Sequence, residues 1–214
     1  MLQGFYILPF IYFGESILNV INIKEAKKNS DKMDDNSKKI IRSLNENKFD
    51  DLFHKYGEEY GIDWLFLKSQ VKCESNFNHK AVNKKTGAKG LCQITDWMWE
   101  DITRLMPGRL GRKKNFHPFD PANSILAQCL YLEYSFKRID DLLINKSYLL
   151  DWTLAVYKMG IVKVLGGTTK SGRYVKGMFE KLANEPIEEA WMTFEPELFE
   201  YISDVIDTRD NYKK

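Results

Sequence analysis

Helix start and stop signals recur along this 214-residue chain, and no stretch of useful length alternates apolar and polar residues as a strand would. Asp120 followed by Pro121 marks a helix start, and Gly61 and Gly160 each follow an apolar pattern with helical spacing. Such signals predict helices over residues 15–28, 36–47, 49–60, 62–75, 95–105, 120–139, 148–159, 172–183 and 196–207. We therefore expect a mainly α fold.

Residues 77–92 interrupt the helical pattern directly after the 62–75 helix. Asparagine, threonine and glycine gather in this short window, at Asn78, Asn83, Thr86, Gly87 and Gly90. That composition is typical of a loop or a small β-hairpin. The expected fold is thus mainly α with a small β-hairpin at this place.

Charge is distributed unevenly along the chain. Residues 62–178 hold 19 Lys and Arg against 10 Asp and Glu, a net +9, whereas residues 179–214 hold 4 against 10, a net −6. A basic body indicates an anionic polymer as partner, either nucleic acid or a bacterial cell wall. The hydrophobic share of 43% and the aromatic share of 14% exclude wholesale disorder.

The cysteines and histidines give no sign of a metal site. Cys73, Cys92 and Cys129 are odd in number and have no CxxC spacing, and the three histidines are scattered. We expect neither a disulfide framework nor a bound metal, and nothing in the sequence requires a cofactor. Three buried thiols are the expected state.

An apolar run over residues 4–13 stands near the N-terminus. It is far shorter than the ~20 residues of a spanning helix, so no transmembrane span is expected. No Lys or Arg precedes it, and no small-x-small cleavage site follows before Lys24. Two interpretations stay open: a signal or anchor, or a segment that packs on the protein or on a partner.

Glu74 is the acid with the most informative position. Trp64, Leu67, Val71 and Glu74 lie on one face of the 62–75 helix, so the carboxylate stands at the end of an apolar stripe. One interpretation is that the helix ends there and Glu74 points into water. The other is a partly desolvated carboxyl with a raised pKa, which is what a general acid requires.

The sequence after Glu74 favours the second interpretation. Residues 73–94 resemble the signature of the soluble lytic transglycosylase (SLT) domain family of the goose-lysozyme-like superfamily. Matching residues are Glu74, Ser75, Phe77, Ala81, Gly87, Ala88, Gly90, Leu91 and Gln93. Asn83 stands where the family has Ser, and Cys92 where it has Met.

Three later segments resemble the same family in the same order. Residues 119–132 resemble its Asp-Pro-x-x-Asn helix, 152–160 its Ala-x-Ala-Tyr-Asn-x-Gly element and 173–175 its closing Tyr-Val pair. In the second, Tyr157 and Gly160 match and Lys158 replaces Asn. The resemblance predicts an N-terminal apolar and helical extension over 1–61, a lysozyme-like catalytic domain over 62–178, and an acidic helical extension over 179–214.

The resemblance implies a peptidoglycan lytic transglycosylase that forms a 1,6-anhydro sugar. Glu74 would be the single general acid and base, because the other acids of residues 62–178 fall at helix starts or on polar faces. Ser75, Asn83, Gln93 and Tyr157 would contact substrate. No metal or other cofactor is implied.

Other interpretations remain open. A goose-type lysozyme would hydrolyse the same bond with a second carboxylate, and a non-catalytic glycan-binding or structural module would keep only the fold. Peptidoglycan is the expected partner in preference to nucleic acid, since no nucleic-acid module surrounds the basic run 109–114. The expected place of action is the bacterial cell wall, reached from the periplasm or by delivery in a phage virion. The terminal extensions would dock onto a phage, secretion or conjugation assembly.

Overall fold

The structure, a computed structural model, describes residues 34–105, 117–143, 146–168, 174–178 and 195–214. Its contacts divide the chain into two compact units, residues 1–48 and residues 49–214. In the first unit, α2 (Asp35–Asn47) begins at Asp34, whose carboxylate accepts a hydrogen bond from the Ser37 N–H at 2.7 Å. None of the residues of α2 is buried.

Two expectations for the N-terminal part, the apolar run 4–13 and the helix over 15–28, lie outside the described residues. Within the part of the chain that the structure describes, no helix is both long and apolar enough to cross a membrane.

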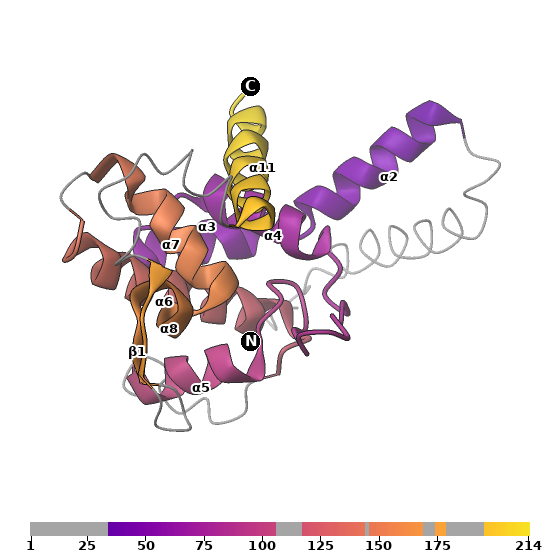
Figure 1. Ribbon diagram of the computed structural model, residues 1–214. Helices are drawn as coiled ribbons and strands as arrows, with labels where there is room; N and C mark the ends of the chain where they lie inside the picture. Colours follow the sequence, from indigo (N-terminus) through magenta and orange to yellow (C-terminus); the bar gives the residue numbers. More distant parts are fainter. Residues whose placement is uncertain (1–33, 106–116, 144–145, 169–173, 179–194) are drawn as a thin grey trace, which may run out of the picture. The chain divides into compact units, whose positions relative to one another are not determined.

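The described residues of the second unit are mainly helical, so the expected mainly α fold is confirmed (Figure 1). The helices described in this unit are α3 (Asp50–Tyr60), α4 (Trp64–Ser75), α5 (Asp96–Leu105), α6 (Pro121–Asp140), the 3₁₀ turn η2 (Lys146–Tyr148), α7 (Leu149–Met159), α8 (Ile161–Leu165) and α11 (Pro196–Tyr212).

Local chemistry explains where these helices begin and end. Gly61 ends α3 in the left-handed conformation, with φ 65°, which costs glycine little. The Asp63 carboxylate then accepts from the Leu65 N–H at 3.0 Å and starts α4. Asp120 accepts from the Asn123 N–H at 2.8 Å and, with Pro121 in the first turn, starts α6.

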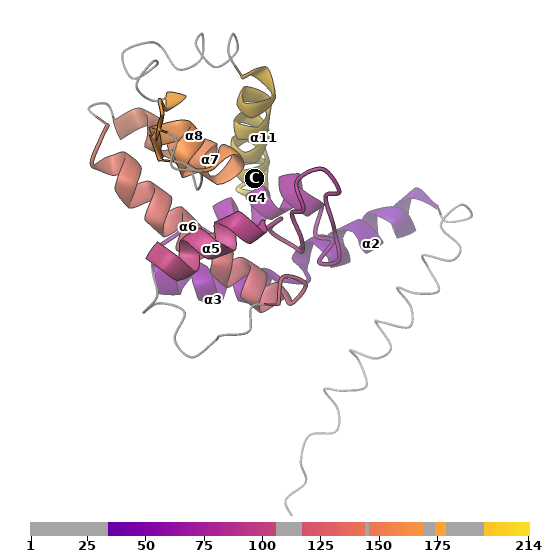
Figure 2. The ribbon, with the colours of Figure 1, turned by 60° about the horizontal axis from the view of Figure 1, so that its bottom comes forward.

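The helices pack around α6, which contacts α3, α4, α5 and α7 (Figure 2). α11 lies against both α4 and α7, although the three are distant in sequence. The side chains of Leu67, Leu130, Trp152 and Val205 are fully buried where these helices meet. The acidic last helix is therefore part of the packed body of residues 49–214.

The small β-hairpin expected beside Glu74 is not confirmed. Residues 76–95 form successive turns with two isolated β-bridges, Val82 to Lys89 and Lys89 to Ile94. The two sides of the turn share only single hydrogen bonds, from the Asn83 N–H to the Ala88 carbonyl oxygen and from the Gly90 N–H to the Ala81 carbonyl oxygen, each at 2.9 Å, so no continuous ladder of strand residues forms. The segment is a compact loop.

Two short strands occur elsewhere, after α8. β1 (Gly167–Thr168) pairs antiparallel with β2 (Tyr174–Val175). The helix expected over 172–183 is therefore wrong at residues 174–175, and most of its remainder lies outside the described residues. The expected division of the chain at residues 61 and 178 stays a prediction.

Candidate active site

A cleft of about 300 Å³ opens between α4, α5, α7 and the loop over 76–95. Four of the five residues expected at the site line it, namely Glu74, Asn83, Gln93 and Tyr157. The remaining described lining residues are Thr86, Ala88, Thr95, Trp97, Met98, Lys158 and Met159. Glu74 is the one carboxylate among the described residues that line this cleft.

Glu74 sits in the last turn of α4, and its side chain is only 8% exposed. Leu67 and Val71, on the same face of the helix, are fully buried. The packing of this face carries the Glu74 carboxyl out of water and into the wall of the cleft. The observed burial agrees with the interpretation as a partly desolvated acid.

Burial raises the pKa of Glu74, and it is the largest influence on this carboxyl. The Lys158 ammonium and a hydrogen bond from Tyr201 lower the pKa, yet the net direction is upward. Glu74 therefore keeps its proton at a higher pH than an exposed glutamate does. A carboxyl in this state suits a general acid.

Lys158 comes from α7 and faces Glu74 across the cleft wall. Its Nζ lies 3.4 Å from Glu74 Oε1, and its side chain is 41% exposed. The same Nζ lies 4.1 Å from the ring centroid of Tyr201, a cation–π contact. The sequence identified Lys158 only as a departure from the family pattern.

Tyr201 comes from α11 and is a residue that the sequence did not indicate. Its hydroxyl is hydrogen-bonded to the Glu74 carboxylate and accepts from Gln70 Nε2 at 3.0 Å. Tyr201 is buried, with 7% of its surface exposed. Its only sequence signal was a place in an amphipathic helix, because the partners on α4 lie far away in the chain.

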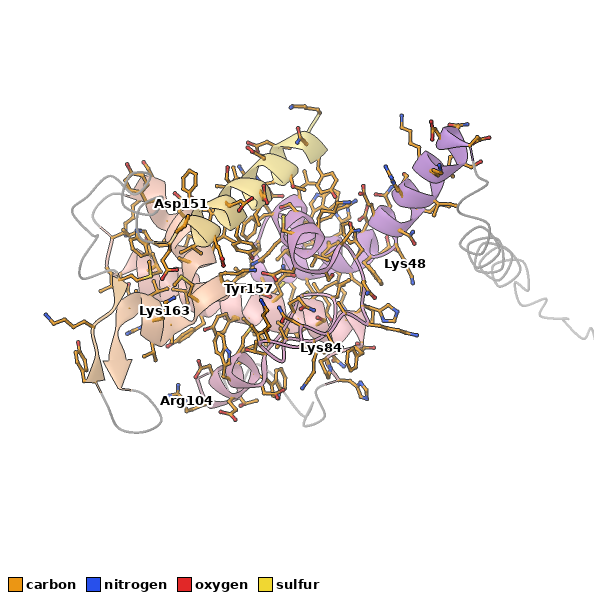
Figure 3. The ribbon with its side chains drawn as sticks, turned by 45° about the vertical axis from the view of Figure 1, so that its right-hand side comes forward. Lys48, Lys84, Arg104, Asp151, Tyr157 and Lys163 are labelled. Atoms are coloured by element: carbon orange, nitrogen blue, oxygen red, sulfur yellow. The ribbon has the colours of Figure 1, made fainter. Side chains whose placement is uncertain are left out.

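Tyr157 lies among the packed side chains of the interior (Figure 3). Its hydroxyl donates to the Cys92 carbonyl oxygen at 2.8 Å, which fixes the loop against α7. Burial raises the pKa of Tyr157 well above its ordinary value, so the hydroxyl remains a donor. Tyr157 therefore holds one wall of the cleft in place.

Ser75 is not among the residues that line the cleft. Its hydroxyl donates to the Leu91 carbonyl oxygen at 2.7 Å and so joins the end of α4 to the loop. That hydrogen bond holds the loop beside Glu74. The expected contact of Ser75 with substrate stays a prediction.

Asn83 and Gln93 lie on the loop side of the cleft. Asn83 Oδ1 accepts from the Lys85 N–H at 2.9 Å, so the turn uses the oxygen, and the NH₂ group is the part suited to donate to a sugar. Gln93 has a positive φ of 51°, and its Nε2 donates to the Gly90 carbonyl oxygen at 2.9 Å. Both amides are held in place by the fold of the loop.

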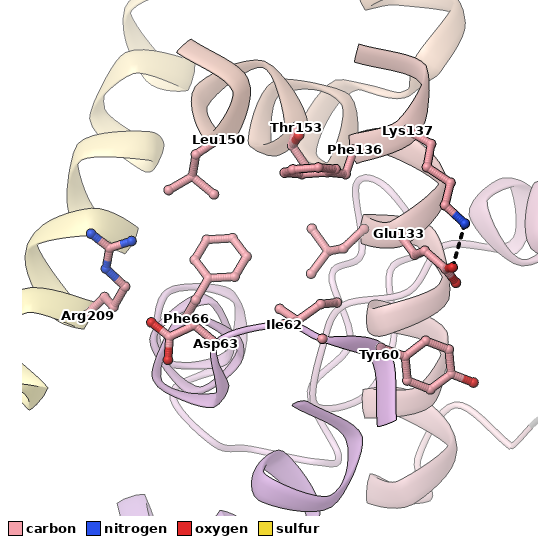
Figure 4. A pocket seen from close by; sticks show the side chains of 12 residues that line it. Tyr60, Ile62, Asp63, Phe66, Glu133, Phe136, Lys137, Leu150, Thr153 and Arg209 are labelled. Carbon is pink, nitrogen blue, oxygen red and sulfur yellow. Dashed lines mark hydrogen bonds and ion pairs between the residues drawn. The ribbon is translucent and has the colours of Figure 1, made fainter. Parts of the chain in front are cut away.

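A larger cavity, of about 370 Å³, lies elsewhere in the same unit and shares no lining residue with the cleft (Figure 4). It is lined mainly by apolar side chains, among them Ile62, Phe66 and Phe136. Its two acids already have partners: Asp63 caps α4, and Glu133 pairs with Lys137 at 2.8 Å. The acid suited to proton transfer is therefore Glu74, in the wall of the smaller cleft.

Among the described residues, no group of three or more His, Cys, Asp and Glu side chains could hold a metal ion. Cys73, Cys92 and Cys129 are free thiols; Cys92 and Cys129 are buried as expected, whereas Cys73 is only partly buried, so the expectation of three buried thiols is wrong for Cys73. Burial raises the pKa of both buried thiols, so they remain protonated and weakly reactive.

Comparison with protein-family models matches residues 51–166 to the transglycosylase SLT domain, more than half of the chain. A search of the curated proteins gave no match. The matched range contains Glu74 and every described residue that lines the cleft. Members of the family are in general murein lytic transglycosylases, so the match indicates a lysozyme-like, glycan-cleaving domain with peptidoglycan as its substrate. The chain belongs to the transglycosylase SLT family.

Proposed function

We propose that this protein is a peptidoglycan lytic transglycosylase, which cleaves the β-1,4 bond between MurNAc and GlcNAc and forms 1,6-anhydro-MurNAc. The observation that carries the proposal is a single buried carboxyl, Glu74, in the wall of a cleft whose other described lining residues include no acid. An inverting hydrolase needs a second carboxylate about 6.5–9.5 Å away to activate water. One acid is enough when the nucleophile belongs to the substrate.

In the first step, protonated Glu74 gives its proton to the glycosidic oxygen as the bond from C1 of MurNAc to that oxygen breaks. The GlcNAc fragment leaves with a free hydroxyl. The carbonyl oxygen of the MurNAc acetamido group stabilises the developing positive charge at C1. The raised pKa of Glu74 supports this acid role.

In the second step, the Glu74 carboxylate removes the proton of the MurNAc 6-hydroxyl, and the oxygen forms the new bond to C1. The product is the 1,6-anhydro sugar, Glu74 regains its proton, and no water is consumed. Lys158, 3.4 Å away, stabilises the carboxylate between the two steps. Burial favours the protonated form of Glu74, which is the acid of the first step. The Lys158 ammonium favours the carboxylate form, which is the base of the second step.

The supporting residues have narrower roles. We assign substrate hydrogen bonds to Asn83 and Gln93, whose amides line the cleft. Tyr157 holds the wall beside the reacting sugar through Cys92, and Ser75 holds the loop through Leu91. The proposed place of action is the cell wall. We also propose that the terminal extensions dock onto a larger assembly, and for the N-terminal one this is supported by α2, none of whose residues is buried.

Digestion of purified peptidoglycan followed by mass spectrometry tests the reaction. We expect MurNAc-terminated products that are lighter by one water than the products of hydrolysis. Products with ordinary reducing ends would overturn this proposal and would show that the protein is a hydrolase.

The variant Glu74→Gln keeps the shape of the side chain and removes its proton transfer, so we expect a loss of activity of roughly 100-fold or more. Glu133→Gln, which changes an acid of the larger cavity, is the matched control and should retain parental activity. If Glu74→Gln clears cell walls as fast as the parent, Glu74 is not the acid.

A further inference from the structure

We propose that α11 is a part of the catalytic centre, and that Tyr201 is a positioning residue that sets the orientation of Glu74. The inference rests on the proposed function of Glu74 as acid and base. It assigns a chemical role to a helix that lies beyond residue 166, where the match to the family ends.

The packing of α11 presents Tyr201 to α4. Leu198, Tyr201, Ile202 and Val205 are spaced as one face of a helix, and each is at most 7% exposed. This face lies against α4 and α7, the two helices that carry Glu74 and Lys158. Tyr201 therefore reaches Glu74 and Lys158 from a third helix.

A chain of buried amides fixes the direction of the Tyr201 hydrogen bond. Gln128 Nε2 donates to Gln70 Oε1 at 2.8 Å, which leaves Gln70 Nε2 to donate to the Tyr201 hydroxyl oxygen at 3.0 Å. Gln70 and Gln128 are both fully buried. Because the Tyr201 oxygen accepts from Gln70, its own proton is directed to the Glu74 carboxylate.

Tyr201 also holds the other partner of Glu74. The Lys158 ammonium rests 4.1 Å from the centre of the Tyr201 ring while it reaches Glu74 Oε1. The ring limits the positions open to a long, partly exposed side chain. One residue of α11 thus orders both the carboxylate and its counter-ion.

The hydroxyl of Tyr201 favours one protonation state of Glu74. A donated hydrogen bond stabilises the carboxylate more than the neutral acid, so it lowers the pKa of Glu74 and supports the second step. Other titratable groups also face Glu74 from α4, α7 and the loop, and they are Cys73, Tyr157, Lys158 and Cys92. We expect the protonation of these groups to be unchanged in Tyr201→Phe, because phenylalanine keeps the ring on which Lys158 rests.

The test is Tyr201→Phe in the full chain, with kcat and KM measured on purified peptidoglycan from about pH 4 to about pH 9. Removal of one hydrogen bond to a charged catalytic group predicts a fall in kcat of roughly 10- to 100-fold near neutral pH. KM should be unchanged, because Tyr201 does not occur among the described residues that line the cleft. The alkaline fall of kcat should move to higher pH, since the variant loses a contact that lowers the pKa of Glu74.

Tyr56→Phe is the matched control, because Tyr56 is a buried tyrosine on α3 that does not line the cleft. It should match the parent in kcat and in pH profile, and thermal unfolding should show both variants folded. A Tyr201→Phe enzyme with parental kcat and an unmoved pH profile overturns the inference. Equal loss at every pH also overturns it, since that is the effect of a merely structural tyrosine.

The two proposals fail in different ways. If the parent forms 1,6-anhydro products and Glu74→Gln does not, the function stands whatever Tyr201→Phe does. If Glu74→Gln retains activity, the function fails first, and the role of Tyr201 fails with it.

Discussion

At Gly90 the loop beside Glu74 packs tightly against the backbone of Pro118, which precedes α6. A Cβ atom at this residue would lie 1.8 Å from the carbonyl oxygen of Pro118 and 2.8 Å from its carbonyl carbon. The neighbour is backbone directly before α6, so it cannot rotate away as the end of a side chain can. The φ of Gly90, +77°, is also one that residues with a side chain rarely adopt.

The positive φ and the close contact with Pro118 both contribute to the loss of stability expected for Gly90→Ala. Holding alanine in the left-handed region costs roughly 1–2 kcal/mol, and overpacking a tight contact costs about 1–3 kcal/mol more. The free energy of unfolding should thus fall by roughly 2–5 kcal/mol, out of a typical total of about 5–15 kcal/mol. For a chain of this size that corresponds to a fall in Tm of roughly 10 °C.

Gly87→Ala separates the two effects, because Gly87 has nearly the same φ, +73°, but a Cβ atom added there would have no neighbour within 4 Å. This variant should lose only the conformational contribution of roughly 1–2 kcal/mol. Urea unfolding followed by circular dichroism measures both variants against the parent. Equal destabilisation of the two would refute the argument that close approach to Pro118 requires glycine at residue 90.

Two further predictions concern the site and the fold. Lys158→Met removes the ammonium that lowers the pKa of Glu74; because Glu74 must hold a proton to start the reaction, the alkaline fall of kcat should move to higher pH. A pH–rate profile measures this, and a move to lower pH would contradict the assignment. Asp120→Ala removes the acceptor for the Asn123 N–H and should lower the free energy of unfolding by about 1 kcal/mol in a urea titration, whereas an unchanged midpoint would deny the cap a role.

Local signals in the sequence were enough to locate most helices. Gly61, Asp63 and Asp120 act through hydrogen bonds or backbone angles within a few residues of themselves, so their effect is readable without tertiary structure. The last helix was expected to end at residue 207 and continues to Tyr212. Its final turns are polar, and polarity alone does not mark a helix end.

The site was predictable as far as the motifs reach. Glu74, Asn83, Gln93 and Tyr157 share one cleft because the motif residues lie on α4, the following loop and α7. The contact of Tyr201 with α4 was not predictable, since Gln70 and Tyr201 are 131 positions apart and no local pattern records such a pairing. The burial of one face of α11 against the other helices was likewise not readable from the negative charge of this part of the chain.

The meeting of α4 and α11 also has a consequence for the order of folding. Contacts between residues this far apart in the chain close a long loop, and closing it costs entropy that local helix contacts do not. We therefore expect α3 and α4 to associate before α11 docks. In that order of events, we expect the Glu74 carboxyl to be buried against Tyr201 only when α11 docks, so that the centre around Glu74 is completed late in folding.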